Sequence, residues 1–206
     1  MKVHIKICGI TRLEDALYAE KLGASAVGFV FFRKSPRYIN PEQARKISES
    51  LGPFIARVGV FVDEDPVIVH NIARTAHLTV LQFHGAESPD YISTFKGFGI
   101  IKGLRVGNDF DPKILSMYNK NTILLDTLVP DNYGGTGKTF DWGKVLVCGN
   151  DYRIILAGGL NPSNVREALK IVKPWGVDIS SGVELSPGIK DHEKMKAFFN
   201  TVSMPL

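Results

Sequence analysis

Short apolar runs alternate with segments of helical periodicity along the whole chain. The apolar runs are nearly continuous in Val, Ile, Leu and Phe, which is typical of parallel strands buried on both faces. They cover residues 3–8, 26–32, 57–62, 80–84, 99–105, 122–126, 153–157 and 176–180. Segments with a helical pattern follow them at residues 13–22, 41–50, 66–75, 89–95, 112–118, 140–146, 162–172 and 191–202. The pattern therefore predicts eight strand–helix units.

This alternation predicts an α/β fold, specifically a small (β/α)8 or TIM barrel that forms a single domain over residues 1–206. A doubly wound open sheet alternates strands and helices in the same way and is the competing architecture. The count of eight units and the absence of a GxGxxG motif after the first strand favour the barrel. A capping residue followed by proline marks helix starts at Asn40-Pro41, Ser88-Pro89, Asp111-Pro112 and Asn161-Pro162.

Composition narrows the class of protein. Hydrophobic residues make up 44% and charged residues 22% of the chain, as in an ordinary globular protein. The net charge of +4 is scattered, without a run of five Lys or Arg, so we expect neither a nucleic-acid nor a membrane partner. No apolar stretch reaches the ~18 residues that span a bilayer, and no apolar leader precedes the first strand, which together predict a cytoplasmic location.

Cysteine and histidine spacing indicates neither a metal site nor a disulfide framework. The two cysteines, Cys8 and Cys148, form no CxxC pair, and the five histidines are dispersed. Residues 137–139 read Gly-Lys-Thr as in a P-loop, but the first glycine of that motif is replaced by Asn132. We interpret the glycine-rich segment 134–137 as a pliable loop over the barrel mouth.

In a barrel the carboxyl ends of the strands meet on one face, which carries the active site. Each chemically capable residue there also has a structural interpretation, because a thiol can be a buried apolar group and an arginine a solvated cation. The combination of a thiol, a carboxyl, a guanidinium and an imidazole on one face nevertheless predicts a functional site. The residues concerned are Cys8, Arg37, Gln82, His84, Asp126 and Asp178.

The loops after strands seven and eight predict a phosphate site. Gly158-Gly159 follow the seventh strand, and Ser180-Ser181-Gly182 follow the eighth. Glycines let backbone N–H groups approach a ligand closely, serine hydroxyls add donors, and barrels frequently bind phosphate at this place. Tight turns would explain either loop alone. Both loops together predict a small phosphorylated substrate.

With these residues assembled, the chain resembles the phosphoribosylanthranilate isomerase family of tryptophan biosynthesis. The matching segments occur in the family's order along nearly the whole chain: KICGIT, GFVF, SPRYI, VGVF, LQFHG, LLDT, GGTGKTFDW, AGGLNPSNV and VDISSGVE. KICGIT and GGTGKTFDW are the specific ones. Only the residues after strand two and the stretch 128–132 look variable.

The resemblance implies an Amadori rearrangement of N-(5-phosphoribosyl)anthranilate, with Cys8 as general base, Asp126 as general acid and Arg37 in contact with the anthranilate carboxylate. Gln82, His84 and Asp178 are expected to bind substrate as well. No cofactor or metal is implied. The chemistry requires a Cys8 thiolate favoured by nearby donors or cations, and an Asp126 that keeps its proton through burial or a negative neighbour.

Alternatives remain open at this point. Another phosphosugar barrel, such as an indole-glycerol-phosphate synthase or an epimerase, would share the phosphate loops, and so would a barrel that binds phosphorylated metabolites without turnover. A synthase would be expected to carry a catalytic Lys in an early strand. Lys6 lies two residues before Cys8 on the same strand face, so substitution of Lys6 by Met tests this alternative. A side activity on the histidine-pathway aminoaldose is a further alternative. The histidine-pathway barrel is expected to have Asp at the end of the first strand, so Cys8 argues against that substrate being preferred. The chain is expected to be a monomer or a homodimer.

Overall fold

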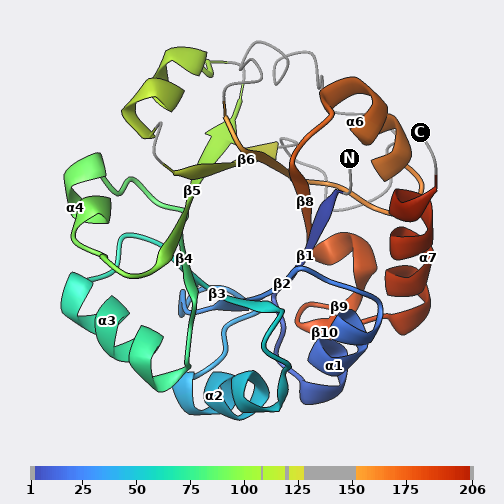
Figure 1. The fold of residues 1–206 in the computed structure, drawn as a ribbon, viewed down its shortest axis with the longest axis horizontal. Helices are drawn as coiled ribbons and strands as arrows, with labels where there is room; N and C mark the ends of the chain where they lie inside the picture. The colour runs from blue at the N-terminus through green and yellow to red at the C-terminus, as the bar shows by residue number, and fades with distance from the viewer. Residues whose placement is uncertain (1–2, 108, 119–120, 128–151, 205–206) are drawn as a thin grey trace.

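The computed structural model describes residues 3–107, 109–118, 121–127 and 152–204. Its parallel strands form a closed barrel in chain order, and the last strand pairs with the first (Figure 1). The strands are β1 (His4–Cys8), β2 (Ala26–Val30), β3 (Ala56–Phe61), β4 (Val80–Phe83), β5 (Gly99–Val106), β6 (Thr122–Thr127), β7 (Ile154–Ala157) and β8 (Gly176–Ile179). The predicted (β/α)8 barrel is confirmed. The predicted helix at 140–146, the glycine-rich loop at 134–137, Asn132 and Cys148 lie outside the described residues.

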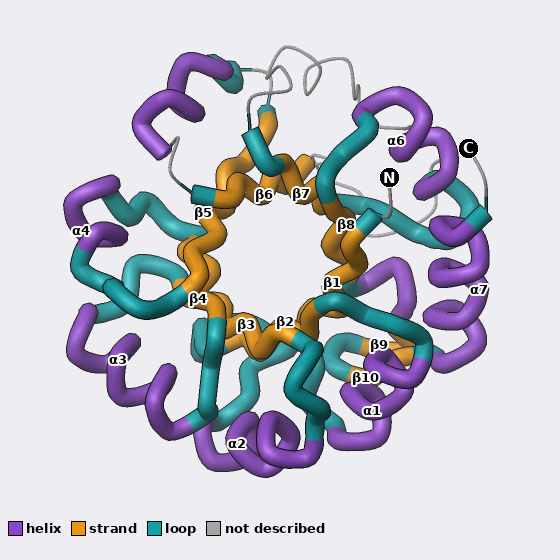
Figure 2. The backbone as a smooth tube through the Cα atoms, viewed as in Figure 1, coloured by secondary structure: helices purple, strands orange, loops and turns teal. Residues whose placement is uncertain are grey.

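Helices surround the ring of strands, as Figure 2 shows in purple around orange. The α-helices are α1 (Leu13–Lys21), α2 (Pro41–Ser50), α3 (Pro66–Thr75), α4 (Pro89–Ser93), α6 (Val165–Val172) and α7 (His192–Ser203). The segment predicted as a helix at 112–118 is a 3₁₀-helix, η1 (Pro112–Tyr118). Residues three apart coincide on one face of such a helix, so the spacing of its two buried residues, Leu115 and Tyr118, suits the tighter form.

Side-chain caps fix where several helices begin. Asn40 Oδ1 accepts from the Gln43 N–H at 2.8 Å, and Ser88 Oγ accepts from the Tyr91 N–H at 3.2 Å. Each cap satisfies an N–H group that has no partner inside its helix. Asn161 Oδ1 likewise accepts from backbone N–H groups, but the α-helix that follows begins only at Val165, three residues later than predicted.

The alternation of side chains along the strands divides the core in two. On β1, Ile5 and Ile7 belong to the large apolar layer between strands and helices. Lys6 and Cys8 point the other way, into the barrel, where both lie over Gly28 of β2. A separate apolar cluster fills part of the barrel interior and consists of Val58, Ile101, Leu124, Ile155 and Ala157.

Between β8 and α7 the chain forms elements that the hydrophobic pattern did not predict. These are a 3₁₀ turn, η2 (Ser181–Val183), and an antiparallel hairpin of β9 (Glu184–Ser186) and β10 (Ile189–Lys190). Only two or three residues form each strand of the hairpin, too few for a periodic signal. The hairpin matters because it brings Glu184 and Lys190 to the site.

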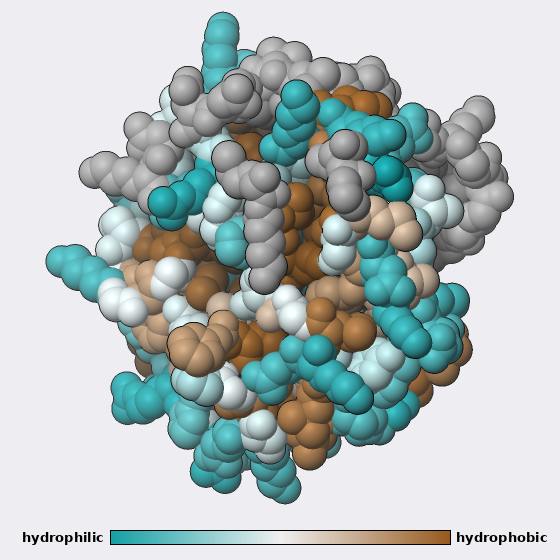
Figure 3. All heavy atoms as spheres, turned by 45° about the vertical axis from the view of Figure 1, so that its right-hand side comes forward, coloured by the Kyte–Doolittle hydropathy of each residue, from teal (hydrophilic) through white to brown (hydrophobic). Residues whose placement is uncertain are grey.

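Polar and apolar side chains share the face of the molecule that Figure 3 shows. On the face shown in Figure 3, hydrophilic side chains occupy most of the periphery, and apolar residues show between them. None of the helices in the described part of the chain has the length and apolar character needed to cross a membrane.

Candidate active site

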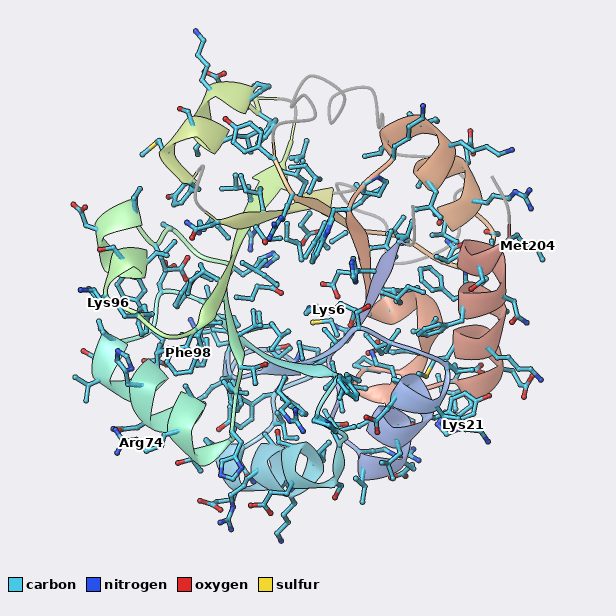
Figure 4. The ribbon with its side chains drawn as sticks, in the orientation of Figure 1. Lys6, Lys21, Arg74, Lys96, Phe98 and Met204 are labelled. Carbon is cyan, nitrogen blue, oxygen red and sulfur yellow. The ribbon has the colours of Figure 1, made fainter. Side chains whose placement is uncertain are left out.

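Cys8 ends β1 beside a buried ion pair. Lys6 Nζ donates to both carboxylate oxygens of Asp178 on β8, each at 3.0 Å, and their side chains are only 4% and 9% exposed. Lys6 and Asp178 are register partners in the seam that closes the barrel. Lys6 is labelled in Figure 4, in the interior of the ring beside β1. The thiol thus has a cation and an anion as close neighbours.

Gly28 of β2 allows this arrangement. A Cβ added at Gly28 would lie 3.0 Å from the Cys8 sulfur and 3.1 Å from Lys6 Nζ. Such distances are tighter than ordinary van der Waals contacts. The absent side chain therefore leaves room for the thiol and the ammonium to lie together.

The ionisation of Cys8 is a balance of opposing causes. Burial raises its pKa, the positive charge of Lys6 lowers it, the negative charge of Asp178 raises it, and Lys190 lowers it again. Burial prevails, so the pKa of Cys8 lies above its ordinary value of 9.0. Burial alone would lower the pKa of Lys6, but the charges of Asp178 and Cys8 raise it above 10.5. At neutral pH the site therefore holds Cys8 as a thiol beside the Lys6 ammonium.

A second polar group comes from β4 and β6. Gln82 Nε2 lies 3.1 Å from His84 Nδ1, and His84 Nε2 lies 3.2 Å from Asp126 Oδ2. If the Gln82 amide donates to Nδ1, the histidine carries its proton on Nε2 and donates it to Asp126. This chain of contacts orients Asp126 Oδ2.

Arg37, from the loop after β2, is held by Glu184. Arg37 Nε donates to Glu184 Oε1 at 2.9 Å, and Arg37 Nη2 donates to Glu184 Oε2 at 2.6 Å. Lys190 Nζ donates to the same carboxylate at 2.8 Å and to the backbone oxygens of Cys8 at 2.6 Å and Ser180 at 3.3 Å. Lys190 thus ties the end of β1 to the loop after β8, while Glu184 ties that loop to Arg37.

The charges in this network depend on one another. Burial by itself would raise the pKa of Glu184, but hydrogen bonds from Arg37 and Lys190 outweigh it and lower the pKa below 4.5. Burial lowers the pKa of Lys190 below 10.5, although the Glu184 carboxylate opposes that change. Glu184 is therefore ionised at neutral pH, and its charge stabilises two cations.

The loops after β7 and β8 lie against each other. A Cβ at Gly182 would come within 2.0 Å of the Leu160 backbone oxygen, so only glycine permits this approach. Gly158 and Gly159 both have positive φ, 87° and 62°. Ser180 Oγ is buried and has no hydrogen-bond partner among the described residues. The residues expected to hold phosphate are thus brought together in space.

The structure gathers most of the residues named from the sequence and adds others. Gln82, His84 and Asp126 form one chain of contacts, whereas Asp178 and Arg37 are each engaged by a charged partner. Glu184 and Lys190 were not predicted. Glu184 closes the VDISSGVE segment, but nothing local marks Lys190. Among the described residues, no group of three or more His, Cys, Asp or Glu could hold a metal ion.

Comparison with known proteins identifies close relatives. Residues 5–201 match the family model of N-(5'-phosphoribosyl)anthranilate isomerase. A Thermotoga maritima protein named N-(5'-phosphoribosyl)anthranilate isomerase is 49% identical over 198 residues, which cover 95% of this chain and 96% of that protein.

Solved structures agree with these matches. The crystal structure of phosphoribosyl anthranilate isomerase from Thermotoga maritima has a TM-score of 0.91 at 48% identity and covers 97% of this chain and 98% of its own. An isomerase in complex with reduced 1-(o-carboxyphenylamino)-1-deoxyribulose 5-phosphate gives 0.88 at 44% identity, with the same coverage. Monomers derived from the dimeric Thermotoga maritima enzyme give 0.87 at 42% identity, again over 97% and 98% of the chains.

Proposed function

The chain belongs to the N-(5'-phosphoribosyl)anthranilate isomerase family, and from that premise we propose how its own residues isomerise N-(5-phosphoribosyl)anthranilate to 1-(2-carboxyphenylamino)-1-deoxyribulose 5-phosphate in tryptophan biosynthesis. The observation that carries the proposal is the family match over residues 5–201, a range that contains every residue assigned to the site. Cys8 and Asp126 stand on β1 and β6 of the same closed barrel, at strand ends.

Asp126 is the proposed general acid. It gives a proton to the furanose ring oxygen, the bond from that oxygen to C1 breaks, and the nitrogen lone pair forms a protonated Schiff base. His84 contacts Asp126 Oδ2. That contact supports a geometry in which Oδ1 faces the ring oxygen.

Cys8 is the proposed general base. Its thiol first releases a proton to solvent, and the thiolate then takes the proton from C2 of the Schiff base, which leaves an enolamine that ketonises. The protonated Schiff base is a cation close to the sulfur, so it lowers the pKa of Cys8 when substrate is bound. This offsets the burial that raises that pKa in the free enzyme.

The remaining polar groups are proposed to hold the substrate. Gln82 Oε1 and Ser180 Oγ are buried without hydrogen-bond partners among the described residues, and such atoms are expected to be satisfied by a ligand or water. We assign Gln82 and His84 to the sugar and Arg37 to the anthranilate carboxylate. The phosphate is assigned to Gly158, Gly159, Ser180, Ser181 and Gly182.

The direct test is the loss of anthranilate-type fluorescence as freshly prepared N-(5-phosphoribosyl)anthranilate is consumed. The purified chain should consume it well above the uncatalysed rate, and Cys8→Ala should be slower by about 10²–10⁴-fold while remaining folded. Consumption at only the background rate would overturn the proposed activity. A folded Cys8→Ala protein with normal turnover would remove the thiol from the mechanism.

We also propose that the chain forms a homodimer. The dimeric Thermotoga maritima relative motivates this, and Phe54, between α2 and β3, is 99% exposed. Covering such an apolar side chain with a partner chain removes it from water, which favours association. Sedimentation equilibrium should give twice the chain mass of 22.7 kDa, whereas a single-chain mass at all concentrations would exclude the dimer.

A further inference from the structure

The interior of the barrel at Cys8 contains more charge than two proton transfers require. A buried ion pair is costly to desolvate and is weak evidence for stability by itself. Lys6 and Asp178 are nevertheless both placed inside the barrel, 4% and 8% exposed, directly beside the thiol. Their position therefore suggests a role in the chemistry.

We propose that Lys6 and Asp178 act as an opposed pair of positioning residues that sets the ionisation of Cys8: the Lys6 ammonium stabilises the thiolate, and the Asp178 carboxylate holds that ammonium in place and moderates its effect. The proposal rests on the assignment of Cys8 as general base. It gives Asp178 a function different from direct substrate binding.

Geometry supports the assignment from both strands. Lys6 and Cys8 are on the same face of β1, and Gly28 opposite leaves space for both groups. A Cβ added at Gly28 would lie 3.0 Å from the Cys8 sulfur and 3.1 Å from Lys6 Nζ, and Asp178 accepts from Lys6 through both oxygens. The ion pair and the thiol therefore share one part of the barrel interior.

Other charged groups near Cys8 have settled partners. Lys190, on β10, donates to the Cys8 backbone oxygen and to Glu184. Glu184 in turn binds Arg37. The neighbouring strand β2 contributes Gly28, which has no side chain to titrate. Lys6 and Asp178 are thus the pair whose removal changes the charge at the sulfur most directly.

The test uses substitutions that must act in opposite directions. Lys6→Met removes the cation, and the midpoint of Cys8 deprotonation should rise by about one pH unit or more. Asp178→Asn removes the anion while Lys6 stays, and the midpoint should fall. The double variant should stay above wild type, because the stabilising cation is gone. If Lys6 and Asp178 had a role in packing alone, the two substitutions would not shift the midpoint of Cys8 deprotonation in opposite directions.

The midpoint is measured in the free enzyme through the pH dependence of alkylation by iodoacetamide. The thiolate attacks the methylene carbon, a carbon–sulfur bond forms and iodide leaves, so the rate follows the thiolate fraction. Mass spectrometry of the peptide that carries Cys8 separates it from Cys148. Lys102→Met is the matched control, because Lys102 is another buried lysine in an ion pair, with Glu87 at 2.8 Å.

Shifts of opposite sign for Lys6→Met and Asp178→Asn, with Lys102→Met unchanged, support the proposal. Shifts of the same sign, or shifts no larger than those of the control, overturn it. If Lys6→Met fails to fold, Asp178→Asn alone decides, since an unchanged or raised midpoint contradicts the model. Alkylation needs no substrate, so failure of the proposed isomerase activity would appear separately in the fluorescence assay.

Discussion

Two of the buried lysine–carboxylate pairs among the described residues, Lys102–Glu87 and Lys6–Asp178, have different surroundings. Lys102 of β5 donates to Glu87 at 2.8 Å and to the Gly85 backbone oxygen at 2.6 Å, and its ammonium lies 5.8 Å from the centre of the Tyr118 ring. The Glu87 carboxylate also accepts from the Gly85 N–H. This pair is enclosed by backbone groups and an aromatic ring. It holds the loop after β4 against β5.

The pair on the closing seam has a different neighbour. Lys6 and Asp178 contact each other, and the Cys8 thiol, a group that can change charge, lies with Lys6 over Gly28. A buried ion pair of this kind stabilises the fold where backbone atoms surround it, and beside the titratable side chain of Cys8 we propose that it sets the ionisation of the thiol. The comparison predicts that changes inside the barrel mainly affect turnover and changes outside it mainly affect stability.

The largest effect is expected inside the barrel, at Asp126. Asp126→Asn keeps the size of the side chain but removes the proton donor, so turnover should fall by about 10²–10⁴-fold. The side chain is 34% exposed, so thermal stability should change little. Steady-state kinetics and thermal denaturation check both parts. Normal turnover in a folded variant would remove Asp126 from the proposed mechanism.

Outside the barrel, Lys102→Met should lower stability and leave turnover largely unchanged. It leaves the 5% exposed Glu87 without its cation, and breaking a buried pair costs about 3–5 kcal/mol of unfolding free energy. Urea denaturation measures the loss. The variant should keep most of its turnover at a temperature where it remains folded. A stability near that of wild type would show that the enclosed pair contributes little.

Glu184 is an intermediate case, because it belongs to the site and is also buried. Its hydrogen bonds to charged groups suggest that Glu184→Gln lowers stability at pH 7 by about 1.5–3 kcal/mol. The pKa of Glu184 is lowered on folding, so its stabilisation is present above the ordinary value of 4.5 and is lost as pH falls. The stability difference between the two proteins should therefore shrink below pH 4.5. A constant difference would contradict the linkage.

The smallest effect is expected on the outer layer. Asp65 caps α3 by accepting from the Val67 N–H at 2.8 Å. Asp65→Ala should lower the unfolding free energy by about 1 kcal/mol, because the orphan N–H groups of Val67 and Ile68 lose their acceptor. Turnover should not change, since α3 contributes no residue to the proposed site. A measurable loss of turnover would contradict the prediction that changes outside the barrel mainly affect stability.

The order of strands and the strand-end residues could be predicted because they depend on local patterns. Cys8 and Asp126 stand where buried apolar runs stop, and a closed barrel brings such ends together. The sequence predicted the bounds of the helix at 112–118, but its 3₁₀ form depends on how Leu115 and Tyr118 pack. Local propensity does not contain that information.

The charged partners could not be predicted, because they depend on register between distant segments. The Lys6–Asp178 contact joins residues 172 positions apart, and Lys190 reaches Cys8 across 182 positions. The sequence places Lys6 on the face of Cys8 but does not say that Asp178 lies opposite. The raised pKa of Cys8 likewise follows from burial, which the predicted thiolate did not take into account.

The seam between β1 and β8 has a consequence for biogenesis. Translation runs from the N-terminus, so Cys8 is synthesised 182 residues before Lys190 and long before Asp178. An incomplete chain on the ribosome carries the thiol without Asp178 or Lys190, the charged neighbours that β8 and β10 supply. The charges that β8 and β10 place around the Cys8 sulfur therefore assemble only when the barrel closes, and a chain that ends before β8 lacks them.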